Sequence, residues 1–139
     1  MATVQDVMTK DPICIPQTSP VASAARAMRD NDIGDVLVTD DQEKVIGIVT
    51  DRDVAIRGVA EGLDLEETQL REVCTSAPTT VSPTDDLALA SRLMQEQALR
   101  RLPVVDNGTP VGIVSLGDLS RQPGSAAVLA GISEAPPNQ

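Results

Sequence analysis

The sequence contains no phenylalanine, tryptophan, tyrosine or histidine among its 139 residues. Without aromatic rings, a bound base has no aromatic side chain to stack on and must lie between aliphatic side chains. Without histidine, the chain lacks the commonest general base, the commonest metal ligand and any Ser-His or Cys-His nucleophile pair. We therefore expect neither an enzyme nor a metal centre.

Cysteine is scarce, and long apolar runs are missing. Cys14 and Cys74 are too few for a disulfide framework, and they do not form a CxxC motif. The N-terminal residues include no apolar signal-peptide region, and no run approaches the roughly 18 apolar residues of a membrane span. These features predict a cytoplasmic protein with reduced thiols and no membrane association.

The charge balance is strongly acidic, with a formal net charge of −10 at pH 7. Because like charges repel, nucleic acids and acidic membrane surfaces are not expected as partners. A small anionic ligand can still bind where arginine is concentrated locally. The hydrophobic fraction of 41% is enough for a core without disulfides or metals, and the length suits one domain or two small ones that share a core.

The chain carries an internal repeat. Val7–Thr9 matches Val73–Thr75 at an offset of 66 residues, and Val38 matches Val104 at the same offset. Matched spacing over so many positions indicates a duplication. After a one-residue deletion in a turn, the further matches are Gly47–Thr50 with Gly112–Ser115 and Asp53 with Asp118.

Each copy has the pattern of a β-α-β-β-α unit. Ser19 is predicted to be the N-cap of the first helix, with Pro20 at its first position, and Asp85 and Asp86 stand at the equivalent place. An Asn-Gly pair between two apolar runs of the second copy is typical of a hairpin turn. The expected strands are 13–15, 36–39 and 45–49 in the first copy and 79–81, 102–105 and 111–114 in the second, with closing helices that begin near Asp51 and Leu116.

This pattern predicts an α/β (α+β) fold made of two tandem β-α-β-β-α units that pack with pseudo-twofold symmetry. We assign the repeats to residues 1–60 and 70–122, joined by a linker at 61–69 and followed by a partly flexible tail at 123–139. A three-stranded unit of this size exposes too much apolar surface to be stable alone. Apolar helix faces that remain after the copies pack predict a C2 homodimer.

Three strings resemble those of cystathionine-β-synthase-type (CBS) domain pairs, also called Bateman modules. They are Gly47–Asp53, Gly112–Asp118 and Arg100–Val105. The resemblance covers residues 3–122. Together with Asp32–Gly34, the string that ends at Asp53 is similar to those of stand-alone pairs related to the hypoxic-response proteins of high-GC bacteria. The resemblance implies two tandem CBS units with a regulatory, stress-response role and no attached catalytic domain.

The resemblance also implies nucleotide sites in two clefts between the copies. In the family, a Thr/Ser-x-x-Asp motif contacts the ribose, which here gives Thr50 with Asp53 and Ser115 with Asp118. A carboxylate can accept hydrogen bonds from two vicinal hydroxyls, and such charge-assisted bonds are strong. The same motif before a helix is also a capping box, which stabilises a helix without any ligand. Both interpretations can hold together.

The resemblance implies that the two clefts are unequal. The second copy has Arg100 and Arg101 before its central strand, where the family often has phosphate contacts, whereas the first has Gly34 and Asp35. An aspartate there would repel phosphate, so we expect the better site at Ser115 and Asp118. The arginines are alternatively a solvated pair or a dimer contact. The better site is completed by Ile13, Cys14 and Ile15 as the adenine wall, and the other cleft contains Thr50, Asp53, Thr79 and Thr80, with Arg52 as its only close cation.

Two functions remain open at this point. The first is a sensor that binds AMP, ADP or ATP as a ligand, with no cofactor, and that changes its shape or its affinity for an unidentified protein partner. The alternative is a ligand-free, dimeric interaction or scaffold protein. Cys14 is interpreted as a small core residue in preference to a redox sensor, and the acidic runs as turns and solvated faces in preference to calcium sites.

Overall fold

The computed structural model describes residues 2–120 as two compact units. The unit that we call the first comprises residues 12–78 and 108–110, and the second comprises residues 2–11, 79–107 and 111–120. The predicted tail at 123–139 lies outside the described residues. None of the helices within residues 2–120 is long and apolar enough to cross a membrane.

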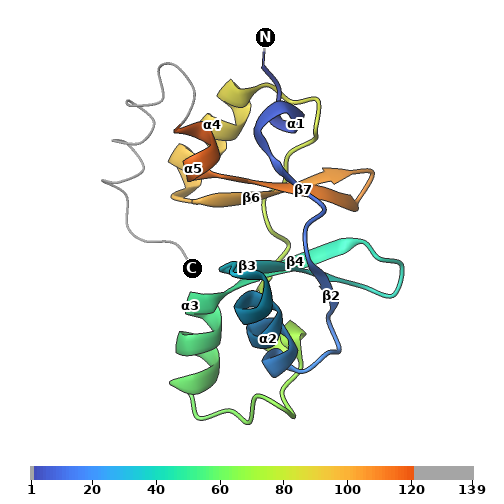
Figure 1. The fold of residues 1–139 in the computed structure, drawn as a ribbon, viewed down its shortest axis with the longest axis vertical. Coiled ribbons are helices and arrows are strands. Elements are labelled where there is room, and N and C mark those ends of the chain that lie inside the picture. The colour runs from blue at the N-terminus through green and yellow to red at the C-terminus, as the bar shows by residue number, and fades with distance from the viewer. Residues whose placement is uncertain (1, 121–139) are drawn as a thin grey trace. The chain divides into compact units, whose positions relative to one another are not determined.

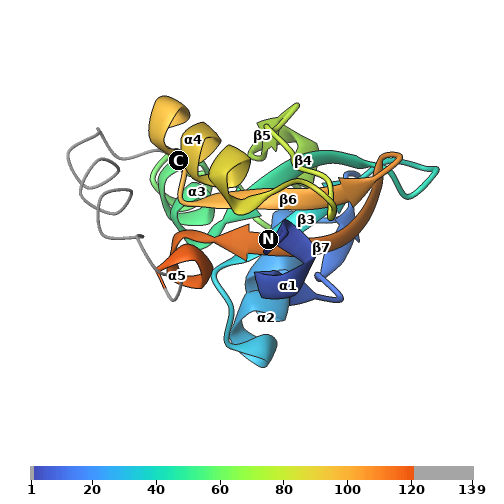
Figure 2. The same ribbon diagram turned by 90° about the horizontal axis from the view of Figure 1, so that it is seen from above.

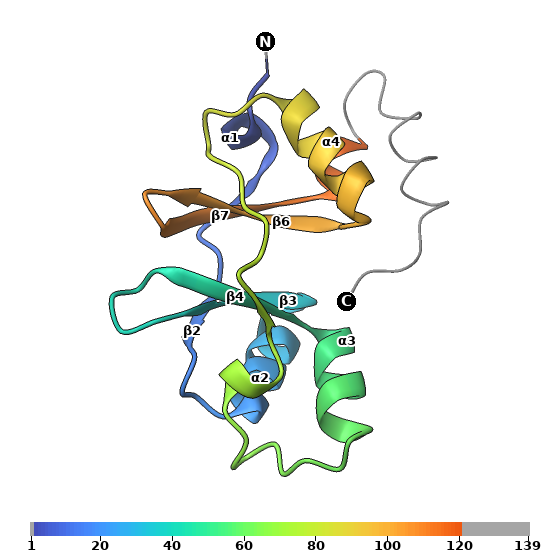
Figure 3. The same ribbon diagram turned by 180° about the vertical axis from the view of Figure 1, so that it is seen from behind.

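The first unit is built on a four-stranded sheet with helices on one face. The strand order is β2-β3-β4-β5, in which β2 is parallel to β3 and the other neighbours are antiparallel. Helix α2 and the closing helix lie on the same side of β3 and β4 (Figure 3). The bounds are β2 Cys14–Pro16, α2 Val21–Asn31, β3 Asp35–Thr39, β4 Val45–Thr50 and β5 Thr75–Ser76.

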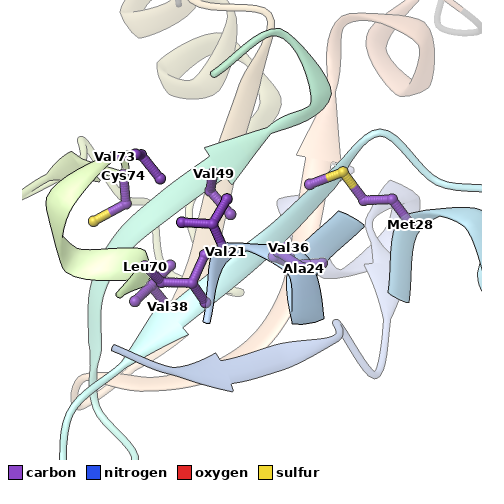
Figure 4. Close-up of a cluster of buried hydrophobic side chains, with 9 residues drawn as sticks. All are labelled: Val21, Ala24, Met28, Val36, Val38, Val49, Leu70, Val73 and Cys74. Atoms are coloured by element: carbon purple, nitrogen blue, oxygen red, sulfur yellow. The ribbon is translucent and has the colours of Figure 1, made fainter. Parts of the chain in front are cut away.

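The core of this unit is made of small aliphatic side chains. Successive side chains of a strand point to opposite faces, so Val36 and Val38 share the face that α2 covers. Figure 4 shows the cluster formed with α2, β4 and the segment after residue 69. Burying each valine or leucine contributes about 1.5–3 kcal/mol, which replaces the missing aromatic core. The buried members are Val21, Ala24, Met28, Val36, Val38, Val49, Leu70, Val73 and Cys74.

Helix α2 begins one residue later than predicted. Pro20, with φ −60° and ψ 146°, is its N-cap, and Ser19 is not. The cause is pairing with the segment that follows the predicted linker, because Leu70 N–H donates to the Ser19 carbonyl and Pro20 forms a bridge with Gln69. This pairing keeps Pro20 extended, so Pro20 cannot be the first helical residue and becomes the N-cap itself, and the predicted cap at Ser19 is wrong.

The segment predicted as a linker, residues 61–69, takes over the capping of α2. The backbone N–H of Val21 donates to the Thr68 carbonyl at 2.9 Å, and that of Ala22 donates to the Leu65 carbonyl at 3.0 Å. The first N–H groups of a helix have no partner within it. Carbonyls of this segment therefore supply what a cap side chain would otherwise provide.

The second unit repeats the plan with a three-stranded sheet of order β1-β7-β6. Its helices lie on one side of β6 and β7 (Figure 1), and α4 runs beside β6 (Figure 2). Asp86 is the N-cap of α4, and its side chain accepts from Leu89 N–H, as the sequence predicted for this position. The bounds are α1 Val4–Val7, β1 Thr9–Lys10, α4 Leu87–Gln97, β6 Arg101–Asp106, β7 Thr109–Ser115 and α5 Leu116–Leu119.

The strand predicted at 79–81 is reduced to a single bridge, in which Val81 pairs in parallel with Val104. In the first unit, Leu37 N–H donates to the Ile13 carbonyl at 2.9 Å and extends the ladder. Pro103 occupies the position equivalent to Leu37, and proline has no N–H to donate. The prediction of a full strand was wrong because this ladder bond cannot form.

The leading segment of each repeat adds a short strand to the sheet of the other repeat. Thr9 pairs with Ile113 in the second unit, and Thr75 pairs with Ile48 in the first. Close packing accompanies this exchange, because a Cβ atom on Gly112 would lie 2.8 Å from the Thr9 carbonyl oxygen. The compact units therefore combine segments from both copies.

The closing helices begin where the sequence predicted. In the first unit, α3 (Asp51–Asp53) continues as the π-helix η1 (Val54–Val59), and the short 3₁₀ helix η2 (Leu70–Glu72) follows the linker. In the second unit, α5 starts at Leu116. Two sheets with helices, generated by a duplicated unit, confirm the predicted mixed α/β fold.

Candidate functional site

A capping box occupies the strand-to-helix corner of each unit. Thr50 N–H donates to Asp53 Oδ2 at 2.9 Å, and Asp53 N–H donates to Thr50 Oγ1 at 3.1 Å. The equivalent bonds from Ser115 N–H to Asp118 Oδ2 and from Asp118 N–H to Ser115 Oγ are 2.7 and 3.1 Å. Both aspartates therefore stabilise their own helices, and the capping interpretation is confirmed at both corners.

The residues before each central strand lie directly beside these corners. Asp51 N–H donates to the Gly34 carbonyl at 2.9 Å, and Leu116 N–H donates to the Arg100 carbonyl at 2.8 Å. The same backbone bond is thus made at both corners. It follows that the structure brings Arg100 and Arg101 together with Ser115 and Asp118 in one unit.

The corner of the first unit is closed and internally neutralised. Asp53 is only 1% exposed, and its Oδ1 accepts no hydrogen bond from residues 2–120. Arg57 Nε lies 3.9 Å from that oxygen, and Arg57 also donates to the Val73 carbonyl at 3.2 Å. A buried carboxylate needs such a cationic neighbour because desolvation disfavours its charge.

Arg57 was not among the residues that the sequence singled out. Its position four residues after Asp53 is the signal that could have found it, because residues at i and i+4 are neighbours on a helix. Arg52 is exposed, and its backbone N–H donates to the carboxylate of Asp51. The expectation that Arg52 is the only close cation of this corner is therefore corrected.

The corner of the second unit is slightly less buried and has arginines in the neighbouring segment. Asp118 is 7% exposed, compared with 1% for Asp53. Arg101, the first residue of β6, is partly exposed, and Arg100 is exposed. The segment beside this corner therefore carries two arginines, whereas the equivalent segment of the first unit carries Gly34 and Asp35.

The strand predicted as the adenine wall divides its side chains between two faces. Ile13 and Ile15 pack against the core of the first unit, whereas Cys14 is only partly buried. Thr79 donates its hydroxyl to Gln97 Oε1 at 2.6 Å, and Thr80 is exposed. The part that these residues play in a ligand site stays a prediction.

Neither cysteine has the surroundings of a reactive thiol. Burial, and then the negative charge of Glu43, raises the pKa of the Cys14 thiol. Burial also raises the pKa of Cys74 more than its hydrogen bonds and Arg57 lower it. Reactive cysteines have depressed pKa values, so the interpretation of Cys14 as a packing residue is favoured. Residues 2–120 also contain no cluster of three acidic or cysteine side chains able to hold a metal ion.

Comparison with known proteins gives one consistent result. The model of the CBS domain family matches residues 4–58 and 70–123, which are the two repeats. The CBS domain-containing protein YhcV of Bacillus subtilis is 37% identical over 120 residues, covering 86% of this chain and 84% of that protein. Hypoxic response protein 1 of Mycobacterium tuberculosis is 31% identical over 121 residues, covering 87% and 85%.

Solved structures agree with the sequence comparison. The crystal structure of Hypoxic Response Protein I with two coordinated zinc ions has a TM-score of 0.79 and 30% identity, covering 87% of this chain and 98% of that one. The CBS domain protein PAE2072 from Pyrobaculum aerophilum, complexed with AMP, has a TM-score of 0.80 and 27% identity, covering 96% and 100%.

Proposed function

Because the chain belongs to the CBS-domain family and consists of a tandem pair, we propose that it is a regulatory module that binds an adenosine nucleotide. The corner at Ser115 and Asp118, beside Arg100 and Arg101, is the proposed binding point. One observation carries the proposal: the two arginines adjoin the slightly less buried of two otherwise equivalent corners. A related pair of similar structure, PAE2072, was crystallised with AMP.

A carboxylate that caps a helix, as that of Asp118 does, can accept more than one hydrogen bond. An ionised carboxylate has two oxygens with about four lone-pair sites, and the bond from Ser115 N–H occupies one of them. Hydrogen bonds from two vicinal ribose hydroxyls to such a carboxylate are strengthened by the charge of the acceptor. Cap and ligand contact are therefore compatible at a single side chain.

The arginines provide the complement for phosphate. A guanidinium presents several N–H donors in a planar fork that matches phosphate oxygens. Asp35 occupies the position of Arg101 in the first unit, as the first residue of β3. A carboxylate there repels an anionic ligand, so we assign AMP, ADP or ATP to the second corner. In this proposal, binding in the cytoplasm of the host changes the affinity of a homodimer for a protein partner and involves no catalysis.

A second candidate function, a ligand-free dimeric scaffold, is favoured by one exposed apolar surface. Ile56 and Val59 on η1 are 48% and 63% exposed, and Leu63 shortly after it is 39% exposed. Large apolar side chains gathered in this way are typical of surfaces that contact other proteins. This function requires no nucleotide at either corner.

Thermal melts separate the two functions. A ligand that binds only the folded state adds about 2.7 kcal/mol at a hundred times its dissociation constant, which raises Tm by several degrees. We expect this rise with AMP, ADP or ATP, and its loss in Asp118→Asn, which keeps an oxygen for the cap. Asp85→Asn, which removes one partly exposed charge in the same unit, should keep the rise. An extrinsic dye is required because the chain has no aromatic residue.

If none of the three nucleotides raises Tm, or if Asp118→Asn responds like the wild type, the proposed nucleotide site is wrong. Size-exclusion chromatography with light scattering then tests the scaffold function, which requires a dimer without ligand. Replacement of Val59 by Ser should weaken that dimer, because Val59 is the most exposed of the three apolar side chains.

A further inference from the structure

The first unit contains a pocket that the proposed nucleotide site does not use. Its volume is about 450 Å³, and all of its lining residues belong to residues 12–78 and 108–110. It opens beside the turn between β3 and β4, next to Thr109 at the start of β7. None of the residues of the Asp118 corner lines it. The pocket is therefore a different site from that corner.

The pocket lies on the sheet face opposite α2. Cys14 pairs with Leu37 and Pro16 pairs with Thr39, so these four side chains share one face, while the neighbours of Thr39 along β3 face the core. Cys14, Pro16 and Thr39 all line the pocket. The floor is consequently apolar, with one hydroxyl set into it.

That hydroxyl belongs to Thr39, which is 5% exposed and lines the pocket. Thr39 Oγ1 is not among the fully enclosed unpaired polar atoms of residues 2–120, so a molecule in the pocket can reach it. Hydrogen bonds to charged groups are stronger than neutral ones. A charged group of a ligand in the pocket can therefore form such a bond with this hydroxyl.

The rim of the pocket is acidic. Asp40, Asp41 and Glu43 line it, and none of its lining residues is basic. Asp40 Oδ1 accepts from Gln42 N–H and Lys44 N–H, whereas Asp41 and Glu43 form no ion pair with any residue between 2 and 120. The negative field reaches the floor, since Glu43 helps to raise the pKa of Cys14.

One ammonium group of the chain already lies at this pocket. Lys44 Nζ donates to Thr109 Oγ1 at 3.2 Å, and Thr109 is a lining residue. The three carboxylates of the rim outnumber this one ammonium and disfavour a phosphate, which separates this pocket from the nucleotide site in charge. Pockets of several hundred Å³ hold small organic ligands through an apolar wall and a few polar groups.

We propose that this pocket binds a small organic cation with an alkylammonium group, such as a linear diamine or polyamine. Its methylene chain lies against Pro16 and Pro110, its ammonium groups meet Asp41 and Glu43, and one of them donates to Thr39 Oγ1. The proposal is independent of nucleotide binding, so each can fail without the other.

The test is a titration of the ¹⁵N-labelled protein with putrescine, followed by NMR at physiological ionic strength. We expect saturable shifts confined to residues around Thr39–Glu43 and Thr109, and no saturation with 1,4-butanediol, which lacks charge. The double variant Asp41→Asn/Glu43→Gln should weaken binding at least about tenfold, because hydrogen bonds to charged groups contribute about 1.5–3 kcal/mol each. Thr39→Val should weaken it about fivefold while the fold is kept.

A matched control excludes attraction to the acidic chain as a whole. Glu61→Gln/Glu67→Gln removes the same charge from exposed positions of the same unit and should change the affinity less than about twofold, because exposed charges are screened by salt. Equal weakening by the two double variants, shifts spread over both units, or displacement of putrescine by AMP would overturn the proposal. The absence of saturable binding at millimolar putrescine would do so as well.

Discussion

The two repeats build the same corner but surround it differently. Each has a hydroxyl and an aspartate in a reciprocal capping box, with hydrogen bonds that differ by at most 0.2 Å between the corners. In the first unit the aspartate lies 3.9 Å from Arg57, whereas in the second the helix that begins after Ser115 is hydrogen-bonded to the backbone of Arg100. The box is therefore a structural element of both copies, and our proposal assigns the choice between the corners to the residues beside them.

The repeats also differ in how far their first strand extends. The ladder of the first unit includes the bond from Leu37 to Ile13, and the equivalent bond is impossible at Pro103. A single residue thus converts a strand into an isolated bridge. Equivalent positions of the two repeats consequently form different hydrogen bonds and contacts. Exchanging residues between these positions tests each difference.

The largest difference is expected at the glycines where the leading segments pack. A Cβ atom on Gly112 would lie 2.6 Å from Met8 Sδ and 2.8 Å from the Thr9 carbonyl oxygen, whereas on Gly47 it would lie 2.8 Å from Cys74 Sγ and 3.1 Å from a backbone oxygen. A side chain can shift more easily than a backbone carbonyl. We expect Gly112→Ala to lower the free energy of unfolding by about 3 kcal/mol and Gly47→Ala by about 1 kcal/mol.

Urea denaturation followed by circular dichroism measures both values. Gly117→Ala is a suitable control, because its Cβ would have only one neighbour, at 3.5 Å. Equal losses for Gly47→Ala and Gly112→Ala would show that the two leading segments pack with the same tolerance, contrary to this account.

An exchange at the strand positions should have a smaller effect. Leu37→Pro removes the N–H that the Ile13 carbonyl accepts and should cost about 2 kcal/mol, because a buried acceptor loses its partner. Pro103→Leu should change the stability by less than about 1 kcal/mol and should add one amide, at residue 103, that is protected from hydrogen exchange. Exchange measured by NMR checks both. A rapidly exchanging amide at residue 103 would mean that proline is not what shortens the strand.

Much of the fold could be predicted because the signals are local and occur twice. The Asn-Gly turn, the alternating valines and the Ser/Thr-x-x-Asp boxes each act over a few residues, and the duplication repeats them at fixed spacing. The resemblance suggested Arg100 and Arg101 as phosphate contacts, and the backbone bond from Leu116 to Arg100 places the two segments side by side, while their part in a ligand site stays a prediction.

The features that were missed depend on contacts distant in the sequence. Ser19 is not the N-cap because its carbonyl pairs with the N–H of Leu70, and no local sequence pattern predicts that pairing. The effect of Pro103 depends on which residue faces it across the ladder. Arg57 had a local signal in its spacing from Asp53, but only burial of the aspartate makes that spacing matter.

The smallest expected effect concerns the two thiols, which lie at different depths of the first unit. Burial raises the pKa of both, so each stays protonated in the folded state at pH values where an unfolded thiol ionises. The free energy of unfolding should therefore be unaffected by the thiols below the unfolded pKa and should fall as pH rises above it towards the folded pKa.

Iodoacetamide labelling at pH 8, read by peptide mass spectrometry, should be slower than for unfolded protein and slowest at Cys74, which is the more buried. Faster labelling of Cys74 than of Cys14 would contradict this.

The central claim is that charge beside an otherwise shared corner selects the second repeat for the nucleotide. Isothermal titration calorimetry of AMP against the wild type, Arg101→Asp and Asp35→Arg tests it most directly, with melts to confirm folding. We predict one AMP per wild-type chain, binding weakened at least about tenfold in Arg101→Asp, and wild-type affinity or tighter in Asp35→Arg. Undiminished binding in Arg101→Asp, or loss of binding in Asp35→Arg, would contradict the claim.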